Sequence, residues 1–118
     1  MSKITLQGME FHAYHGCLSH EKELGNTFIL NLTIKLDTKL AGQSDNLADA
    51  LNYQEVYDVV KEQMEIKSNL IEHVAQRIVD AVLQNFKQVK AVKLELSKLH
   101  PPLGAKVGAV TIKLSKNK

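Results

Sequence analysis

Apolar and polar residues alternate along four stretches of the chain, the pattern of β-strands with one buried and one solvated face. These stretches are residues 3–15, 27–37, 89–98 and 107–114. In the second stretch every other residue from Phe28 to Leu36 is apolar. In the first, the phase of the alternation changes at Gly8, which predicts a β-bulge. The pattern therefore predicts four strands, each with one side toward a core.

Two stretches between the second and third strands carry apolar residues at helical spacing instead. The first begins at Asn52, a predicted N-cap with Glu55 three residues further on, and extends to Met64. The second follows Asn69 and extends to Phe86. Both stretches predict amphipathic helices whose apolar sides pack on the sheet.

The predicted elements follow the order β-β-α-α-β-β, so the fold class is α+β, with an antiparallel four-stranded sheet and two helices on one face. Residues 18–25 predict a turn or short helix that ends on a glycine, and residues 41–46 predict a polar connection. Residues 1–118 predict a single domain. Because strands of this length leave long open edges, we also expect subunits to pair into a homo-oligomer, such as a ring.

Charge and cysteine content exclude several classes of function. The formal net charge is only +2, and the basic residues are mostly scattered, so the sequence lacks the cluster expected of a nucleic-acid-binding protein. Cys17 is the single cysteine, which excludes an intramolecular disulfide and suits a reducing compartment. No stretch has the length of a membrane helix, and the start lacks the apolar segment of a signal peptide. We therefore expect a cytoplasmic protein without membrane or nucleic-acid partners.

Lys98 breaks the alternation of the third predicted strand. Val92, Leu94 and Leu96 share one face, and the same period places Lys98 on that face at the strand's end. Desolvation there would favour the neutral amine, lower the pKa of Lys98 and suit it to proton transfer. The alternative is a strand-end lysine whose stem covers apolar surface while its ammonium reaches water. From parity alone this alternative is favoured.

Three further side chains are candidates, and each also has a structural explanation. Glu72, at the start of the second helix, would bind the paired N–H donors of a ligand, or close a capping box with Asn69. Tyr53 would donate a proton, or pack at the start of the first helix. Glu21 lies in a predicted turn, where a carboxylate is usually solvated. On local sequence alone the structural explanation is favoured for all three.

The histidines do not predict a metal site. His12 and His15 point to opposite faces of an extended strand, and His20 follows in the turn. The sequence also lacks a glycine-rich phosphate loop, a Gly-x-Ser-x-Gly turn and a Cys-x-x-Cys pair. We therefore expect no metal ligands, and neither nucleotide hydrolysis nor thiol redox chemistry is indicated.

Four segments in series resemble one family. They are residues 14–21 (YHGCLSHE), residues 44–53 (SDNLADALNY), residues 69–75 (NLIEHVA), and Lys98 ahead of two prolines at 101 and 102. Together they resemble dihydroneopterin aldolase of folate biosynthesis, over nearly the whole chain and in order. One departure is that many members of this family have proline directly after the lysine, whereas Leu99 and His100 intervene here.

The resemblance implies a fold, an assembly and roles for individual residues. The family has the tunnelling fold, in which β-β-α-α-β-β subunits join their sheets into rings and two tetrameric rings stack into an octamer. Glu72 would anchor the aminopyrimidinone edge of the pterin, with the backbone of Ile71 beside it. Glu21 and Tyr53 match substrate-contacting positions, Tyr53 reaching the site from a neighbouring subunit. Lys98 matches the catalytic lysine.

The implied reaction requires no cofactor. Retro-aldol cleavage leaves electrons on carbon, and enzymes often delocalise them through a Schiff base or a metal. In 7,8-dihydroneopterin a ring imine already conjugates with the side-chain carbon, so proton transfer by Lys98 and Tyr53 would suffice. The products would be 6-hydroxymethyl-7,8-dihydropterin and glycolaldehyde, and recapture of glycolaldehyde on the other face would give epimerisation to dihydromonapterin.

Three other functions fit parts of the same sequence. A tunnelling-fold relative that epimerises dihydroneopterin triphosphate would need several convergent cations, and only Lys98 and Lys106 are candidates. A zinc-dependent pyruvoyl-pterin synthase would need His12, His15 and His20 to converge. A non-catalytic pterin-binding or assembly protein would use Glu72 only as a helix cap.

Overall fold

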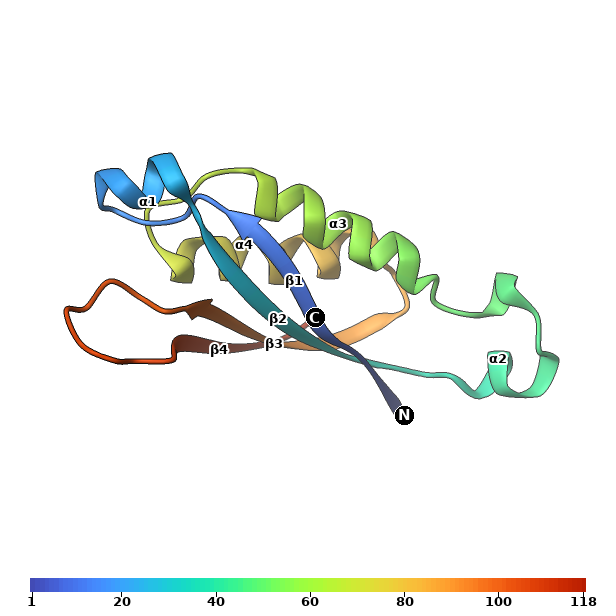
Figure 1. The fold of residues 1–118 in the computed structure, drawn as a ribbon. Coiled ribbons are helices and arrows are strands. Elements are labelled where there is room, and N and C mark those ends of the chain that lie inside the picture. The colour runs from blue at the N-terminus through green and yellow to red at the C-terminus, as the bar shows by residue number, and fades with distance from the viewer.

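The computed structural model describes residues Met1–Lys118, and it confirms the α+β class and the β-β-α-α-β-β order of the main elements (Figure 1). Short helices lie in two connections, and the first confirms the short helix predicted within residues 18–25, which ends on Gly25. In chain order the elements are β1 (Ser2–Ala13), α1 (Ser19–Leu24), β2 (Asn26–Leu36), α2 (Lys39–Ser44), the 3₁₀ turn η1 (Leu47–Asp49), α3 (Tyr53–Glu65), α4 (Ile71–Asn85), β3 (Val89–Leu99) and β4 (Ala109–Asn117).

The four strands form one antiparallel sheet in the order β1-β2-β3-β4. The bulge predicted at Gly8 is confirmed, because the register of β1 against β2 shifts between Leu6 and Met9. Gly8 has a φ of 67°, which glycine adopts readily, and its N–H donates to Asn31 Oδ1 at 2.7 Å. β1 and β4 are the edges, and each pairs on one side only within the chain.

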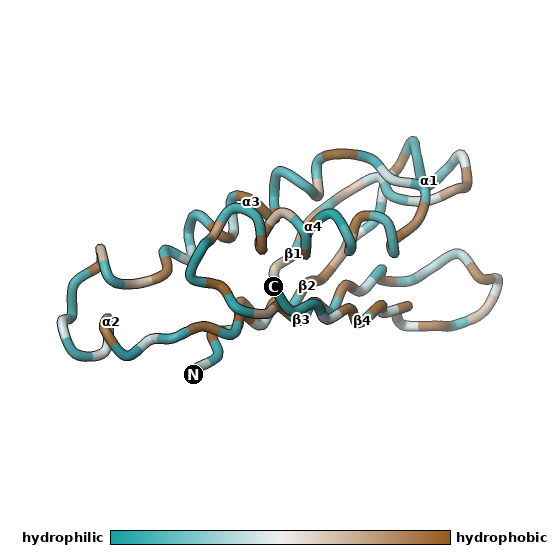
Figure 2. The backbone as a smooth tube through the Cα atoms, turned by 180° about the vertical axis from the view of Figure 1, so that it is seen from behind, coloured by the Kyte–Doolittle hydropathy of each residue, from teal (hydrophilic) through white to brown (hydrophobic).

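Both long helices cover the same face of the sheet (Figure 1). Apolar residues of α3, α4 and every second residue of β2 and β3 form one buried cluster, with Phe28, Leu30, Leu32 and Ile34 fully buried. Figure 2 shows the underlying alternation of hydrophobic and hydrophilic residues along the strands. Burial of this face explains why the period-two pattern predicted the strands well.

The connections differ from the sequence-based prediction. The stretch after β2 is not a simple polar loop, because α2 and η1 lie within it. β1 ends at Ala13 rather than at residue 15, and β4 begins at Ala109 rather than at residue 107. His100 has a φ of 46°, and Gly104 in the same β3–β4 loop has a φ of 72°.

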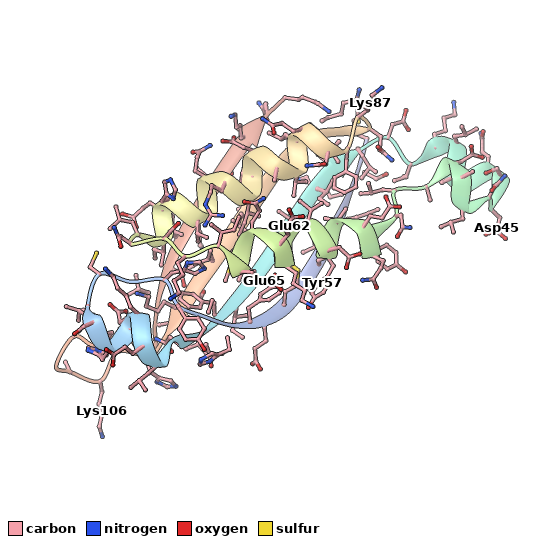
Figure 3. The ribbon with its side chains drawn as sticks, turned by 90° about the horizontal axis from the view of Figure 1, so that it is seen from above. Asp45, Tyr57, Glu62, Glu65, Lys87 and Lys106 are labelled. Carbon is pink, nitrogen blue, oxygen red and sulfur yellow. The ribbon has the colours of Figure 1, made fainter.

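The molecule is elongated, with principal extents of 53 × 24 × 22 Å. Figure 3 places Lys106, in the β3–β4 loop, at one end and Asp45, after α2, at the other. No helix in the structure combines the length and the apolar character needed to cross a membrane.

Candidate active site

A pocket of about 280 Å³ opens at the end of the molecule that carries α1 and the β3–β4 loop. Four of the five residues singled out from the sequence line it: Glu21, Ile71, Glu72 and Lys98. They come from α1, the start of α4 and the end of β3. The fold thus brings together side chains that are up to 77 residues apart in sequence.

Lys98 lies on the core side of β3, as the alternation predicted, opposite the buried Phe28 of β2. Its side chain is only 13% exposed, and its Nζ donates to Glu21 Oε2 at 2.7 Å. Nζ also lies 6.0 Å from the centre of the Phe28 ring. The alternative in which the ammonium reaches open water is therefore wrong.

Glu21 is buried, so the interpretation as a solvated turn residue is wrong. Its Oε1 accepts from the backbone N–H of Leu18 at 3.4 Å, while Oε2 accepts from Lys98. Burial alone would raise the pKa of the Glu21 carboxyl, but these hydrogen bonds and the charge of Lys98 hold it below its ordinary value. A Cβ on Gly16 would lie 2.5 Å from the carboxyl carbon, so this position leaves room for the carboxylate because it is glycine.

Glu72 is exposed, and neither ion pair of the structure involves it. The predicted capping box with Asn69 is wrong, because the N-cap of α4 is Leu70 and no side chain caps the helix. Glu72 is instead the second residue of α4, in the first turn, where the helix dipole favours a negative charge. A carboxylate on the pocket wall without a partner can accept hydrogen bonds from a ligand.

Tyr53 does not join this pocket within one chain. It is the first residue of α3, after Asn52, whose side chain accepts from the N–H groups of Gln54 and Glu55 as the predicted N-cap. Its side chain is 65% exposed and lines a separate pocket beside Leu36. Leu36 is eight residues along β2 from Phe28, the strand partner of Lys98, which corresponds to about 26 Å.

His15 is a buried residue of this region that sequence reasoning did not assign to the site. Its Nδ1 accepts from the backbone N–H of Ser68 at 3.1 Å, and its ring packs edge-on against Phe28. Burial, and then the charge of Arg77, lower its pKa to about 4. The signal was present in the alternation of β1, because His15 continues the parity of Phe11 and Ala13 toward the core.

The three histidines near the N-terminus do not converge. His12 is exposed with Nε2 at 3.0 Å from Leu24 O, His15 is buried against Ser68, and His20 is exposed on α1. No group of three or more His, Cys, Asp or Glu side chains is arranged to hold a metal ion. The geometry required of a zinc-dependent pyruvoyl-pterin synthase is therefore not present.

Comparisons with known proteins agree over the whole chain. The family model of dihydroneopterin aldolase matches residues 4–115. The dihydroneopterin aldolase of Staphylococcus epidermidis is 39% identical over 112 residues, which cover 94% of this chain and 93% of the relative.

Solved structures show the same fold. A putative dihydroneopterin aldolase from Vibrio cholerae superposes with a TM-score of 0.91 at 26% identity, covering 100% of this chain and 98% of that one. The E. coli dihydroneopterin aldolase, crystallised in complex with neopterin, superposes with a TM-score of 0.90 at 22% identity, covering 99% and 100%. With a family model and a full-length relative in agreement, the chain belongs to the dihydroneopterin aldolase family.

Proposed function

We propose that the protein cleaves 7,8-dihydroneopterin by a retro-aldol reaction into 6-hydroxymethyl-7,8-dihydropterin and glycolaldehyde. The observation that carries this proposal is the buried Lys98–Glu21 pair, which lies in one pocket with the unpartnered carboxylate of Glu72. The family and the neopterin complex of the E. coli relative support a pterin as the ligand. A pair of proton-transfer groups next to an acceptor for N–H donors suits this substrate.

Glu72 would hold the substrate. The aminopyrimidinone edge of a pterin carries adjacent N–H donors, and the two oxygens of one carboxylate can accept from both. Because Glu72 has no competing ion pair, its carboxylate is available for this contact. The backbone of Ile71, in the same wall, would provide a further contact with the ring.

Lys98 would transfer the protons, as general base and then as general acid. Removal of the proton from the hydroxyl group next to the bond that breaks allows a C=O bond to form there, while the carbon–carbon bond breaks and its electrons move into the conjugated ring imine. Glycolaldehyde leaves, and protonation of the resulting enamine gives the hydroxymethyl product. Glu21 would orient the amine and compensate its charge, and a water between Lys98 and the substrate can relay the proton.

Tyr53 would complete the site from a neighbouring subunit. Within one chain it lies at the end of the molecule opposite Lys98, and the edges β1 and β4 are open for pairing. Head-to-tail pairing of subunits would bring the two ends together in a ring, and we propose the octamer of two tetrameric rings. Closure of each site by a second chain would exclude water and make assembly a condition for turnover.

The reaction is tested by measuring glycolaldehyde release from unphosphorylated 7,8-dihydroneopterin. We expect turnover, with dihydromonapterin as a minor product because the enamine intermediate can recapture glycolaldehyde on its other face. The rival is an epimerase of dihydroneopterin triphosphate, and the triphosphate is therefore assayed in parallel. Conversion of the triphosphate alone would contradict the aldolase proposal.

The shared site is tested by mixing two inactive variants, Lys98→Ala and Tyr53→Ala. If each site combines Lys98 of one chain with Tyr53 of the next, random mixed rings at equal amounts contain about a quarter of intact sites. Unfolding and refolding the mixture should then restore activity that neither variant has alone. Absence of restored activity in mixed rings, verified by mass, would contradict the contribution of Tyr53 from a second chain.

A further inference from the structure

Two hydrogen bonds join the segment after β1 to the segment before α4. The Ser68 N–H donates to His15 Nδ1 at 3.1 Å, and the Gly16 N–H donates to the Ser68 carbonyl oxygen at 3.0 Å. We call this pair of hydrogen bonds the 15–68 clasp. Because a backbone N–H can only donate, Nδ1 must carry a lone pair, which fixes the neutral ring with its proton on Nε2.

The clasp connects the parts of the pocket that come from distant places in the sequence. On one side the chain continues from Gly16 to Glu21, whose carboxylate holds Lys98. On the other side it continues from Ser68 into the wall formed by Asn69, Leu70, Ile71 and Glu72. The His15 ring also packs against the Phe28 ring, at 5.3 Å between centroids, and the ammonium of Lys98 lies over that same Phe28 ring.

We propose that His15 is a positioning residue, which sets the distance between the pterin anchor at Glu72 and the proton-transfer pair Lys98–Glu21. This inference rests on the roles given to those residues in the proposed function. A misplacement of reacting groups by about 1 Å can slow a reaction by about two powers of ten, so a contact outside the pocket can control turnover.

The neutral state of the ring agrees with this role. Arg77 from α4 and Lys98 from β3 are the charged groups that act on His15, and both oppose a positive charge on it. Arg77 itself donates to Ser68 Oγ at 3.0 Å and to Ile66 O at 2.8 Å. These hydrogen bonds fix the segment that contains Ser68. Protonation of Nδ1 would replace the acceptor of the Ser68 N–H with a second donor.

The competing explanation is that His15 only fills the core, since it is 1% exposed. Two substitutions separate the explanations. His15→Phe keeps the ring and its packing on Phe28 but removes the acceptor. His15→Asn loses volume, but its side-chain oxygen is attached to Cγ as Nδ1 is, so it can accept from the Ser68 N–H. The exposed His12, changed to Phe, is the matched control.

The experiment measures kcat and KM for 7,8-dihydroneopterin and the urea midpoint of each variant. For a positioning residue, His15→Phe should lower kcat by about 10–100-fold with KM changed less than about threefold, because the Glu72 anchor stays intact. His15→Asn should be less stable but keep kcat within about threefold of the wild type. If the Phe variant keeps the wild-type kcat, or if the Asn variant is the slower of the two, His15 is a packing residue and the proposal is wrong.

A second measurement applies even where the Phe variant does not fold. Nitrogen-15 NMR of the wild-type imidazole should show Nδ1 unprotonated and Nε2 protonated at neutral pH, and a protonated Nδ1 would overturn the clasp. Wild-type activity separates the two proposals. An inactive wild type would contradict the proposed function, whereas an active wild type with an unaffected His15→Phe variant would contradict only the role of His15.

Discussion

The two ion pairs of the structure lie toward opposite ends of the β3–β4 ladder and differ in burial. Lys98, on β3, contacts Glu21 at 2.7 Å, and Lys116, on β4, contacts Asp80 at 2.8 Å. Both lysines extend from the helix-covered face of the sheet, since Lys98 lies opposite Phe28 and Lys116 lies opposite the buried Val92. The side chains are 13% and 9% exposed in the first pair, but 49% and 36% exposed in the second.

Nearly equal N···O distances therefore have a different physical meaning in the two ion pairs. Water surrounds the Lys116–Asp80 pair and screens it, so it contributes little to stability. The Lys98–Glu21 pair is largely removed from water but faces the pocket, where its charges would act on a bound ligand through a medium of lower dielectric constant. Burial in the pocket wall distinguishes the ion pair that we propose to be functional, and substitutions at both ends can test this distinction.

The largest effect is expected from Lys98→Ala. Loss of the proton-transfer group should lower turnover by about 10²–10⁴-fold, while pterin binding remains because Glu72 is intact. Glycolaldehyde release measures the first quantity, and fluorescence titration with a pterin measures the second.

Lys116→Ala is the matched control, because it removes a lysine with an equally short ion pair and should leave turnover unchanged. A similar loss of turnover in both variants would show that turnover depends on any ion pair next to the sheet, and not on the position of Lys98 in the pocket. Wild-type turnover in Lys98→Ala would contradict the catalytic role of Lys98.

The next effect is expected from Glu72→Ala, which tests the carboxylate that has no ion pair. Removal of both acceptor oxygens should weaken pterin affinity by about 100-fold or more, since hydrogen bonds to charged groups contribute about 1.5–3 kcal/mol each. Titration with a pterin under the same conditions measures the dissociation constant. Glu62, on the exposed side of α3 (Figure 3), provides the control Glu62→Ala. Unchanged affinity in Glu72→Ala would contradict the anchor.

Glu21→Gln should act on stability and on its pH dependence. The amide keeps a hydrogen-bond acceptor for Lys98 but removes the compensating charge, so the free energy of unfolding should fall by about 1–3 kcal/mol near neutral pH. The pKa of the Glu21 carboxyl is lower in the folded protein than its ordinary value of 4.5, so its contribution is complete above 4.5 and is lost as the pH falls through the lower folded value.

The difference between wild type and Glu21→Gln should therefore shrink on acidification. Urea denaturation at about pH 7 and about pH 3.5 measures it. If the difference in the free energy of unfolding stays constant or grows in acid, the charge of Glu21 does not stabilise the folded protein.

Sequence patterns predicted the positions of site residues that lie in a regular strand or at a helix start. The alternation placed Lys98 on the core side of β3, and the Asn52 cap fixed the start of α3. Glu21 was misjudged from local sequence because its burial depends on Lys98, 77 residues away, and on the space left at Gly16. Only the family resemblance pointed to it.

The wrongly predicted start of α4 has the same physical origin, and the site of Tyr53 is also beyond local sequence. Asn69 is a residue type that often caps helices, yet the N-cap of α4 is the next residue, Leu70. The segment before it is held by hydrogen bonds of Ser68 with His15 and Arg77. Tyr53 cannot be connected with Lys98 from one chain at all, because the contact proposed for it is between subunits. A tertiary contact, which no local pattern encodes, decides the start of α4, and the proposed contact between subunits would decide the partner of Tyr53.

The smallest effect, from Asp80→Asn, gives the sharpest check of the comparison. Asp80 accepts from Lys116 and from Gln76, and the hydrogen bond from Lys116 lowers the pKa of its carboxyl. Since the pair is exposed, the substitution should cost about 0–1 kcal/mol, and this cost should vanish at about 1 M salt, where the Debye length is about 3 Å. Urea denaturation at low and high salt measures it beside Glu21→Gln, whose cost should persist in salt because the buried pair is screened less. If the two costs were equal and equally sensitive to salt, burial would not distinguish the pairs, and the functional role assigned to Lys98–Glu21 would lose its physical basis.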